Sequence, residues 1–155
     1  MCGIAGIAQF NQDPISLDML ARMSRQTEHR GPDAAGIVIQ ATWGLAHRRL
    51  SIIDLSDNGC QPMSDKSGRL TISFNGEVYN FRRLREYLEK EGVAFRTATD
   101  TEVLLEGYKF WGIDGLLRRV EGMFAFALWD EKRKQLFVAR DRFGEKPFYY
   151  SLVDQ

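Results

Sequence analysis

Strand patterns in this sequence come in clusters, and helical patterns separate the clusters instead of alternating with single strands. Strict alternation of strand and helix would indicate a parallel sheet with helices on both faces. Clustered strands favour antiparallel pairing, with the helices packed outside the sheets. The chain is therefore expected to have an α+β fold. The expected strands lie at 2–10, 36–40, 43–50, 70–75, 123–129, 135–139 and 148–151.

Helix starts are marked by capping residues at three places. Ser16 can accept a hydrogen bond from the first turn of a helix over 17–27. Asn80 can do the same for a second helix, and Thr99 with Glu102 matches a capping box for a third. Each helix has an apolar stripe that must be covered by another element. The stripes comprise Leu17, Leu20 and Met23; Phe81, Leu84 and Leu88; and Leu104, Tyr108 and Trp111.

The composition indicates one soluble domain with no nucleic-acid or membrane partner. The 155 residues are 44% hydrophobic, enough for one core. Lys plus Arg and Asp plus Glu both number 21, so charge points to no partner. No run approaches the roughly 18 apolar residues of a spanning helix, and the first residues lack a secretory signal. Two cysteines are too few for a disulfide scaffold, and a cytoplasmic location is expected.

Cys2 is the residue most suited to chemistry in this sequence. Removal of Met1 would leave Cys2 with a free α-amino group, and methionine aminopeptidases act when the second side chain is small. An α-amino group has a reference pKa of about 7.7 to 8.0, so it can accept the thiol proton without a histidine partner. One residue then supplies nucleophile and base. The alternative is that Cys2 is a small buried hydrophobic residue.

The two histidines offer other roles. Neither His29 nor His47 stands near a Cys, His or acidic cluster at zinc-ligand spacing, so no metal site is expected. A cysteine–histidine pair with Cys2 stays open, although structural hydrogen bonding is commoner for a histidine beside a sharp loop or within a strand. Cys60 lies in the polar loop at 58–63 with no partner that would lower its pKa, so it is expected to react as an ordinary thiol.

Three further polar positions have a structural and a chemical interpretation. Asn75 and Gly76 end a strand pattern; their amide and N–H can converge on an oxyanion, but the pair by itself favours a hairpin turn. Asp100 falls in the first turn of a helix, where the dipole favours a carboxylate. Arg48 and Arg49 lie within a strand pattern, so a guanidinium there must meet solvent, an acidic partner or a ligand carboxylate.

Seven segments, in this order, resemble the glutaminase domain of class II amidotransferases, nearest the N-terminal domain of glutamine-dependent asparagine synthetases. Each segment alone is weak, but together they span nearly the whole chain. The segments are MCGIAGI at 1–7, HRGPDAAG at 29–36, AHRRLSIIDL at 46–55, FNGEVYN at 74–80, TDTEVLL at 99–105, GMFAFALWD at 122–130 and ARDRFGEKPFYY at 139–150.

The resemblance implies an N-terminal-nucleophile hydrolase fold, in which two stacked antiparallel sheets lie between helices as four αββα layers. It also implies a role for each matching residue. The nucleophile is Cys2, the α-carboxylate of glutamine is bound by Arg49, the oxyanion donors are Asn75 and Gly76, and the α-amino group is bound by Glu77 and Asp100.

The implied reaction is hydrolysis of glutamine to glutamate and ammonia through a Cys2 thioester, with no cofactor or metal. The ammonia would pass to an ATP-dependent synthetase domain or subunit. The sequence has no glycine-rich phosphate loop, so residues 2–155 are expected to form the glutaminase domain alone. The acceptor, aspartate or another carboxylate, and a homodimer stay open. A non-catalytic binding module and a hydrolase of another amide are the rival functions.

Overall fold

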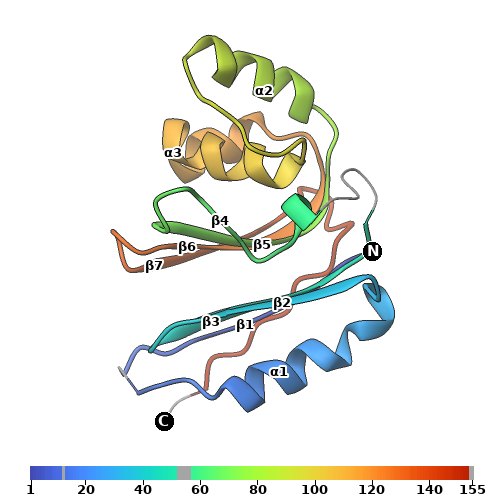
Figure 1. Ribbon diagram of the computed structural model, residues 1–155, viewed down its shortest axis with the longest axis vertical. Helices are drawn as coiled ribbons and strands as arrows, with labels where there is room; N and C mark the ends of the chain where they lie inside the picture. The colour runs from blue at the N-terminus through green and yellow to red at the C-terminus, as the bar shows by residue number, and fades with distance from the viewer. Residues whose placement is uncertain (12, 52–56, 154–155) are drawn as a thin grey trace.

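Four layers stack in the order helix, sheet, sheet, helix in the computed structural model (Figure 1). Helix α1 (Leu17–Gln26) covers one sheet, and α2 (Phe81–Lys90) and α3 (Asp100–Arg119) lie over the other. This arrangement confirms the expected α+β fold with αββα layers. The structure describes residues 1–11, 13–51 and 57–153. Residues 52–55 of the AHRRLSIIDL segment and residues 12, 56 and 154–155 of the expected domain lie outside that description.

Both sheets are antiparallel throughout. The first has the strand order β1-β3-β2, and the second has the order β4-β5-β6-β7. β3 is an inner strand, and near its end Arg48 pairs with both neighbours, whereas the end of β5 pairs with β6 alone because β4 reaches only Thr71 and Ile72. The strands are β1 (Gly3–Ala8), β2 (Ala34–Ile39), β3 (Trp43–Arg49), β4 (Met63–Ser64), β5 (Leu70–Val78), β6 (Gly122–Asp130) and β7 (Gln135–Arg140); two short 3₁₀ helices are η1 (Glu28–Arg30) and η2 (Asp57–Gly59).

The larger hydrophobic core lies between the second sheet and the α2–α3 pair. Aliphatic and aromatic side chains of β5 and β6 face α3, and Phe126 is fully buried. Helix α3 changes direction at Gly112, where φ is 70°, a conformation that glycine adopts at little cost. This core fixes the start of α3 against the end of β5. It includes Leu70, Ile72, Phe74, Val103, Leu104, Tyr108, Phe124, Phe126 and Leu128.

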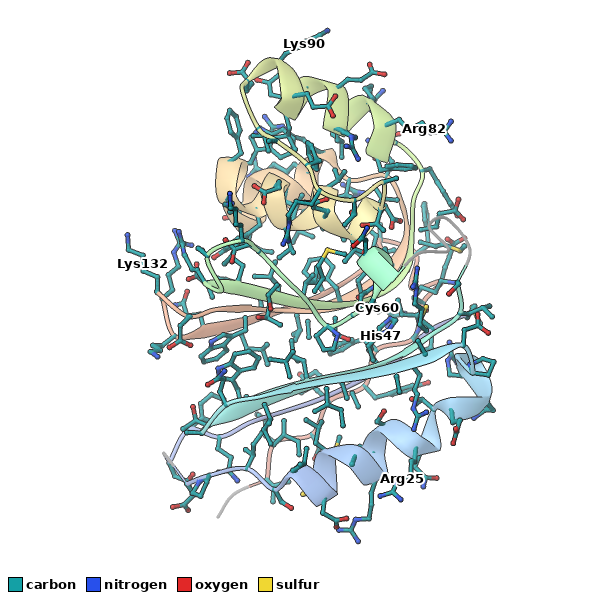
Figure 2. All side chains as sticks on the ribbon, in the orientation of Figure 1. Arg25, His47, Cys60, Arg82, Lys90 and Lys132 are labelled. Atoms are coloured by element: carbon teal, nitrogen blue, oxygen red, sulfur yellow. The ribbon has the colours of Figure 1, made fainter. Side chains whose placement is uncertain are left out.

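The interface between the sheets combines ring stacking with buried hydrogen bonds. The rings of Trp43 and Trp129 stack with centroids 5.1 Å apart. His47 lies between the sheets (Figure 2), and its Nε2 is 3.0 Å from the carbonyl oxygen of Phe74. Ser73 Oγ donates to the carbonyl oxygen of Ala46 at 3.0 Å. These polar bonds hold the end of β3 in a fixed position over β5.

The predicted helix caps are confirmed at two of three positions. Ser16 Oγ accepts an N–H from the first turn of α1 at 3.3 Å. Thr99 Oγ1 accepts the N–H of Glu102 at 3.2 Å, which caps α3 beside the candidate site. Asn80 precedes α2, but its side chain does not cap that helix. It instead bonds backbone groups in 119–121, which ties α2 to the end of α3.

The strand expected at 148–151 is wrong. This segment has no strand structure, and Tyr149 and Tyr150 are 90% and 80% exposed. Aromatic residues favour strands only where a neighbouring strand supplies ladder hydrogen bonds, and none of the described strands pairs with this segment. Leu17, expected in the apolar stripe of α1, is 54% exposed, whereas Leu20 of the same helix is fully buried.

No helix among the described residues is both long and apolar enough to cross a membrane. The same residues contain no group of three or more His, Cys, Asp and Glu side chains placed to hold a metal ion.

Candidate active site

One cavity, of about 110 Å³, is lined by all six residues that the resemblance singled out. It forms where the first residues, the end of β3, the end of β5 and the start of α3 meet, beside the marked N terminus (Figure 1). The six are Cys2, Arg49, Asn75, Gly76, Glu77 and Asp100. The other lining residues are Met1, Leu50, Gly59, Gln61, Phe74, Thr99, Thr101, Met123 and Lys146.

Cys2 is held at the cavity by contacts from two segments. Its Sγ accepts the N–H of Leu50 at 3.4 Å and lies 3.7 Å from the carbonyl oxygen of the same residue. Arg30 Nε donates to the carbonyl oxygen of Cys2 at 3.2 Å. Met1 precedes it with a side chain 55% exposed, so removal of Met1 meets no buried obstacle. These contacts fix the thiol in the cavity wall.

Arg49 and Arg48 point to different surroundings because neighbouring residues in a strand face opposite sides of the sheet. Arg48 bonds Ser24 and Glu28 at the α1 side. Arg49 is 8% exposed and lines the cavity. A Cβ on Gly59 would lie 2.3 Å from Arg49 Nη2, so glycine leaves room for the guanidinium. A buried fork of N–H donors suits a ligand carboxylate.

Asn75 and Gly76 lie inside β5, so the hairpin turn favoured by their sequence is wrong. They pair with Ala125 and Phe124 of β6, and the strand continues to Val78. Asn75 is 5% exposed, and its side-chain amide makes no hydrogen bond within the described residues, which leaves its donors for a ligand. A Cβ on Gly76 would lie 2.3 Å from the carbonyl oxygen of Met123, so glycine allows β6 to approach.

Asp100 and Glu77 place two carboxyl groups in the cavity wall. Asp100 is 5% exposed, and its Oδ2 accepts the N–H of Val78 at 3.0 Å. Burial raises the pKa of Asp100 to about 6; backbone N–H groups at Val78, Thr101 and Asp100 oppose the rise, and the charge of Glu77 adds to it. Glu77 is exposed at the cavity mouth. Neither acid has a cation partner among the described residues, so the pair suits a ligand ammonium group.

His47 and Cys60 lie beside this site, whereas His29 is exposed in η1 and does not line the cavity. His47 is 1% exposed; burial lowers its pKa to about 4, the bond to Phe74 opposes this, and the charge of Arg49 adds to it. Its bond to Phe74 supports the structural role over a pair with Cys2. Cys60 is exposed, and Arg49 Nη1 lies 3.6 Å from its Sγ. The contact between Arg49 and Cys60 joins the end of β3 to the loop that follows η2.

Gln61 and Lys146 are site residues that the sequence interpretation missed. Gln61 Oε1 accepts the N–H of Phe74 at 2.7 Å, and its Nε2 donates to Thr101 Oγ1 at 3.2 Å, so it bridges β5 and α3. Lys146 is 4% exposed although it is a lysine in a loop. Lys146 belongs to the ARDRFGEKPFYY segment, which indicated the family but did not indicate that this lysine lines the cavity.

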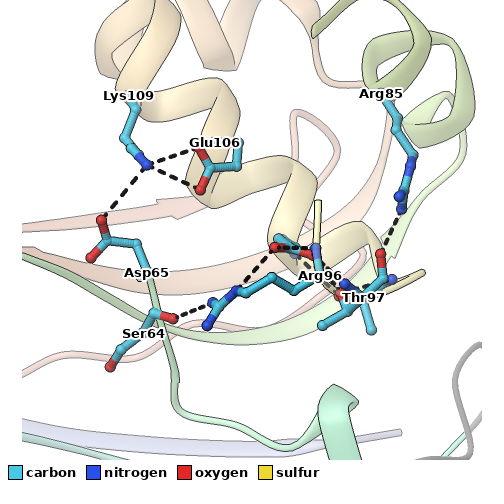
Figure 3. A network of polar contacts seen from close by, with 9 residues as sticks. Ser64, Asp65, Arg85, Arg96, Thr97, Glu106 and Lys109 are labelled. Carbon is cyan, nitrogen blue, oxygen red and sulfur yellow. Dashed lines mark hydrogen bonds and ion pairs between the residues drawn. The ribbon is translucent and has the colours of Figure 1, made fainter. Parts of the chain in front are cut away.

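A larger and more open hollow, of about 680 Å³, lies elsewhere, beside α3. Most of its charged side chains are paired (Figure 3): Lys109 contacts Glu106 and the neighbouring Asp65, and Arg96 lies 3.5 Å from Glu102. Paired charges leave few groups for a ligand. The smaller cavity, which collects a thiol, a guanidinium, an amide and two carboxyl groups, is the better candidate for chemistry.

Comparison with known proteins gives consistent matches over the full length. The chain is 41% identical over 159 residues to asparagine synthetase [glutamine-hydrolyzing] 1 of Bacillus subtilis (strain 168), covering 99% of this chain and 24% of that protein. It is 40% identical to putative asparagine synthetase [glutamine-hydrolyzing] 2 of Methanocaldococcus jannaschii, covering 97% of this chain and 32% of that protein. The chain thus spans about a quarter to a third of the length of these relatives.

The fold is also similar to a solved structure. Glutamine phosphoribosylpyrophosphate amidotransferase from B. subtilis, complexed with ADP and GMP, superposes with a TM-score of 0.74 at 23% identity, covering 91% of this chain and 37% of that one. This likeness concerns the fold alone. The model of the glutamine amidotransferase domain matches residues 1–155. Together with the identities above 30%, this match shows that the chain belongs to the glutamine amidotransferase domain family.

Proposed function

We propose that the chain hydrolyses the side-chain amide of glutamine to glutamate and ammonia. The observation that supports this most strongly is that one small cavity collects a thiol, a guanidinium, an amide and two carboxyl groups from four separate segments. Each polar group of glutamine then has a complementary partner. The name of the B. subtilis relative includes glutamine hydrolysis, which is the same chemistry.

Glutamine binds through its two α-substituents. Arg49 pairs with the α-carboxylate, and Glu77 with Asp100 accepts hydrogen bonds from the α-ammonium group. One cation for one anion and two acids for one ammonium fix the amino-acid end of the substrate. The side-chain amide is thereby directed toward Cys2. This pairing favours a free amino acid over the amide of a larger molecule, which counts against the rival hydrolase.

The reaction begins once Met1 has been removed. The α-amine of Cys2 takes the thiol proton, and Sγ attacks the amide carbon of glutamine. The proton then passes to the amide nitrogen, the C–N bond breaks, ammonia leaves and a thioester remains. Water attacks the thioester, and its proton returns through the amine to the sulfur. The sum is glutamine plus water giving glutamate plus ammonia.

Asn75 and Gly76 stabilise the oxyanion that forms in both halves of the reaction. The amide of Asn75 is buried and free of hydrogen bonds to the described residues, so it needs no rearrangement before the reaction. Neutral donors suit this position, since the negative charge exists only transiently.

The ammonia is used by an ATP-dependent synthetase domain or subunit, and residues 2–155 act as the glutaminase unit. The synthetases among the relatives are three to four times as long as the matched segment, which supports such a partner. Both cysteines are free thiols, as expected in a reducing compartment, and this supports a cytoplasmic location. The molecule that accepts the ammonia is proposed to be a carboxylate, and aspartate is the first one to test.

The test is glutamate formation by the purified chain after removal of Met1, with Cys2→Ala as the control. We expect glutamate and ammonia in equal amounts from the unaltered protein and none above background from Cys2→Ala. Added ATP and aspartate should neither accelerate glutamine loss nor produce asparagine. No glutamate above the control, from folded protein that lacks Met1, would favour the non-catalytic binding module.

A further inference from the structure

A buried lysine lines the candidate active site without a carboxylate partner. Lys146 is 4% exposed, and its Nζ donates to Sδ of Met1 at 2.9 Å. It forms no ion pair with any described residue. Met1 is the residue that must leave before Cys2 can act as an N-terminal nucleophile. Its removal takes away the one hydrogen-bond partner that Lys146 Nζ has among the described residues, and Lys146 lines the same cavity as Cys2.

Backbone hydrogen bonds hold the loop that carries Lys146 in a conformation that keeps this lysine buried. The carboxylate of Asp141 accepts backbone N–H groups from Phe124, Phe143, Glu145 and Lys146. Burial alone would raise the pKa of Asp141, but these N–H donors outweigh burial and lower the pKa to about 2. Asp141 therefore stays charged and keeps the loop closed at any physiological pH. A buried ammonium group without a counter-ion destabilises the folded protein, so its position indicates a functional role.

We propose that Lys146 is a positioning residue whose positive charge keeps the α-amine of Cys2 in its neutral, proton-accepting form. This inference rests on the proposed glutamine hydrolysis and assigns a new residue to it. An amine can serve as a base only while it is unprotonated. A neighbouring ammonium group disfavours a second positive charge in the same low-dielectric cavity and also favours the thiolate of Cys2.

The surrounding charges explain why an additional cation is needed. Glu77 and Asp100 line the cavity and would favour protonation of the amine, as would Asp141 and Glu145 of the lysine loop. Lys146 opposes these acids. Two arginines also face this region: Arg30 contacts the carbonyl oxygen of Cys2, and Arg49 lines the cavity wall. Once glutamine is bound, the charge of Arg49 is matched by the α-carboxylate, whereas that of Lys146 is not.

The test compares pH profiles of kcat/KM for glutamine in three variants, each confirmed by intact mass to lack Met1. Lys146→Met removes the charge and keeps a long apolar side chain. Lys146→Arg keeps the charge. Lys132→Met, on the exposed turn between β6 and β7, removes one charge far from the site and is the matched control (Figure 2).

In Lys146→Met we expect the acid limb of the profile to move to higher pH by about one unit, with activity recovering on the alkaline side. Lys146→Arg and Lys132→Met should keep the unaltered profile. Asp100 lines the same cavity and also responds to the lysine charge, so the variants are compared again in the Asp100→Asn background, where a remaining shift comes from the amine. Thermal unfolding of each variant shows that it is folded, and Lys146→Gln replaces Lys146→Met if that protein does not fold.

Three outcomes would overturn the inference. The first is an unshifted profile in the charge-removing variant. The second is a loss by the same factor at every pH, which indicates a purely structural lysine. The third is a shift of equal size in Lys146→Arg, which contradicts the role of charge. Inactivity of the unaltered protein would count against the proposed function instead, so the two failures are distinguishable.

Discussion

Glutamine affinity should depend on pH because of Asp100. Burial in the cavity wall raises the pKa of this carboxyl group to about 6, and the bond from Val78 N–H holds it in place. The direction follows from the charge that glutamine requires. Above the pKa the group is ionised and attracts the α-ammonium; below it the group is protonated and the attraction is lost. Affinity should therefore fall as the pH drops through about 6.

The size of the effect follows from the ionised fraction. If glutamine binds only the ionised form, the apparent Kd is the intrinsic Kd divided by that fraction. With a pKa of about 6, roughly 90% of Asp100 is ionised at pH 7 and roughly 10% at pH 5. The Kd should thus rise about tenfold between these two pH values. The α-groups of glutamine itself do not titrate in this range.

The assay is calorimetric titration of glutamine into Cys2→Ala, which binds without turnover, between pH 5 and pH 8. Asp100→Asn in the same background is the matched control, because an amide oxygen can still accept the N–H of Val78. We expect this variant to bind roughly 10-fold to 100-fold more weakly at pH 8 and to lose the pH dependence. A pH-independent Kd in the protein with Asp100, or an unchanged slope in Asp100→Asn, would refute the reasoning.

Three further predictions follow from the same geometry. Asn75→Ala should lower kcat about 10²-fold to 10³-fold with little change in KM, measured by steady-state kinetics, because an oxyanion donor acts on the transition state; a change in KM alone would contradict this. Gly59→Ala should raise KM more than it lowers kcat in the same assay, because its Cβ would displace the guanidinium of Arg49. His47 has a folded-state pKa of about 4, below its usual 6.5, because it is buried. The free energy of unfolding should therefore decrease by about 3 kcal/mol between pH 6.5 and pH 4, since the unfolded chain binds a proton that the folded protein does not. Urea unfolding of His47→Gln should show a smaller decrease over the same pH range.

The layer order could be predicted from the sequence because clustered strands and capped helices are local signals. The helix caps predicted at Ser16 and Thr99 are confirmed, because a cap depends only on residues within one helical turn. The strand at 148–151 failed because strand formation depends on a partner that local residues do not specify. Sequence periodicity describes an element, whereas pairing decides whether a strand exists.

The site shows the same division between local and tertiary information. Asn75 and Gly76 have the local preference of a turn, yet β6 supplies a ladder partner that extends the strand through them. Strand alternation separates Arg48 from Arg49, but it does not tell which of the two faces a cavity. Lys146 could not be assigned at all, because its burial results from a loop folded around Asp141. The resemblance to a family supplied the roles that local patterns left open.

The central claim, that Cys2 is an N-terminal nucleophile for glutamine, is tested most directly by covalent labelling and mass spectrometry. A diazo-ketone analogue of glutamine should alkylate Cys2 Sγ with loss of dinitrogen, in a protein whose intact mass shows that Met1 is absent. Cys60 is the internal control, because it is the second free thiol, is exposed to the reagent, and lies near the same site, with its Sγ 3.6 Å from Arg49 Nη1. We expect a single adduct, located on Cys2 by peptide mapping, and protection by glutamine. Labelling confined to Cys60, or adduct formation that is equally fast with Met1 still attached, would contradict the account.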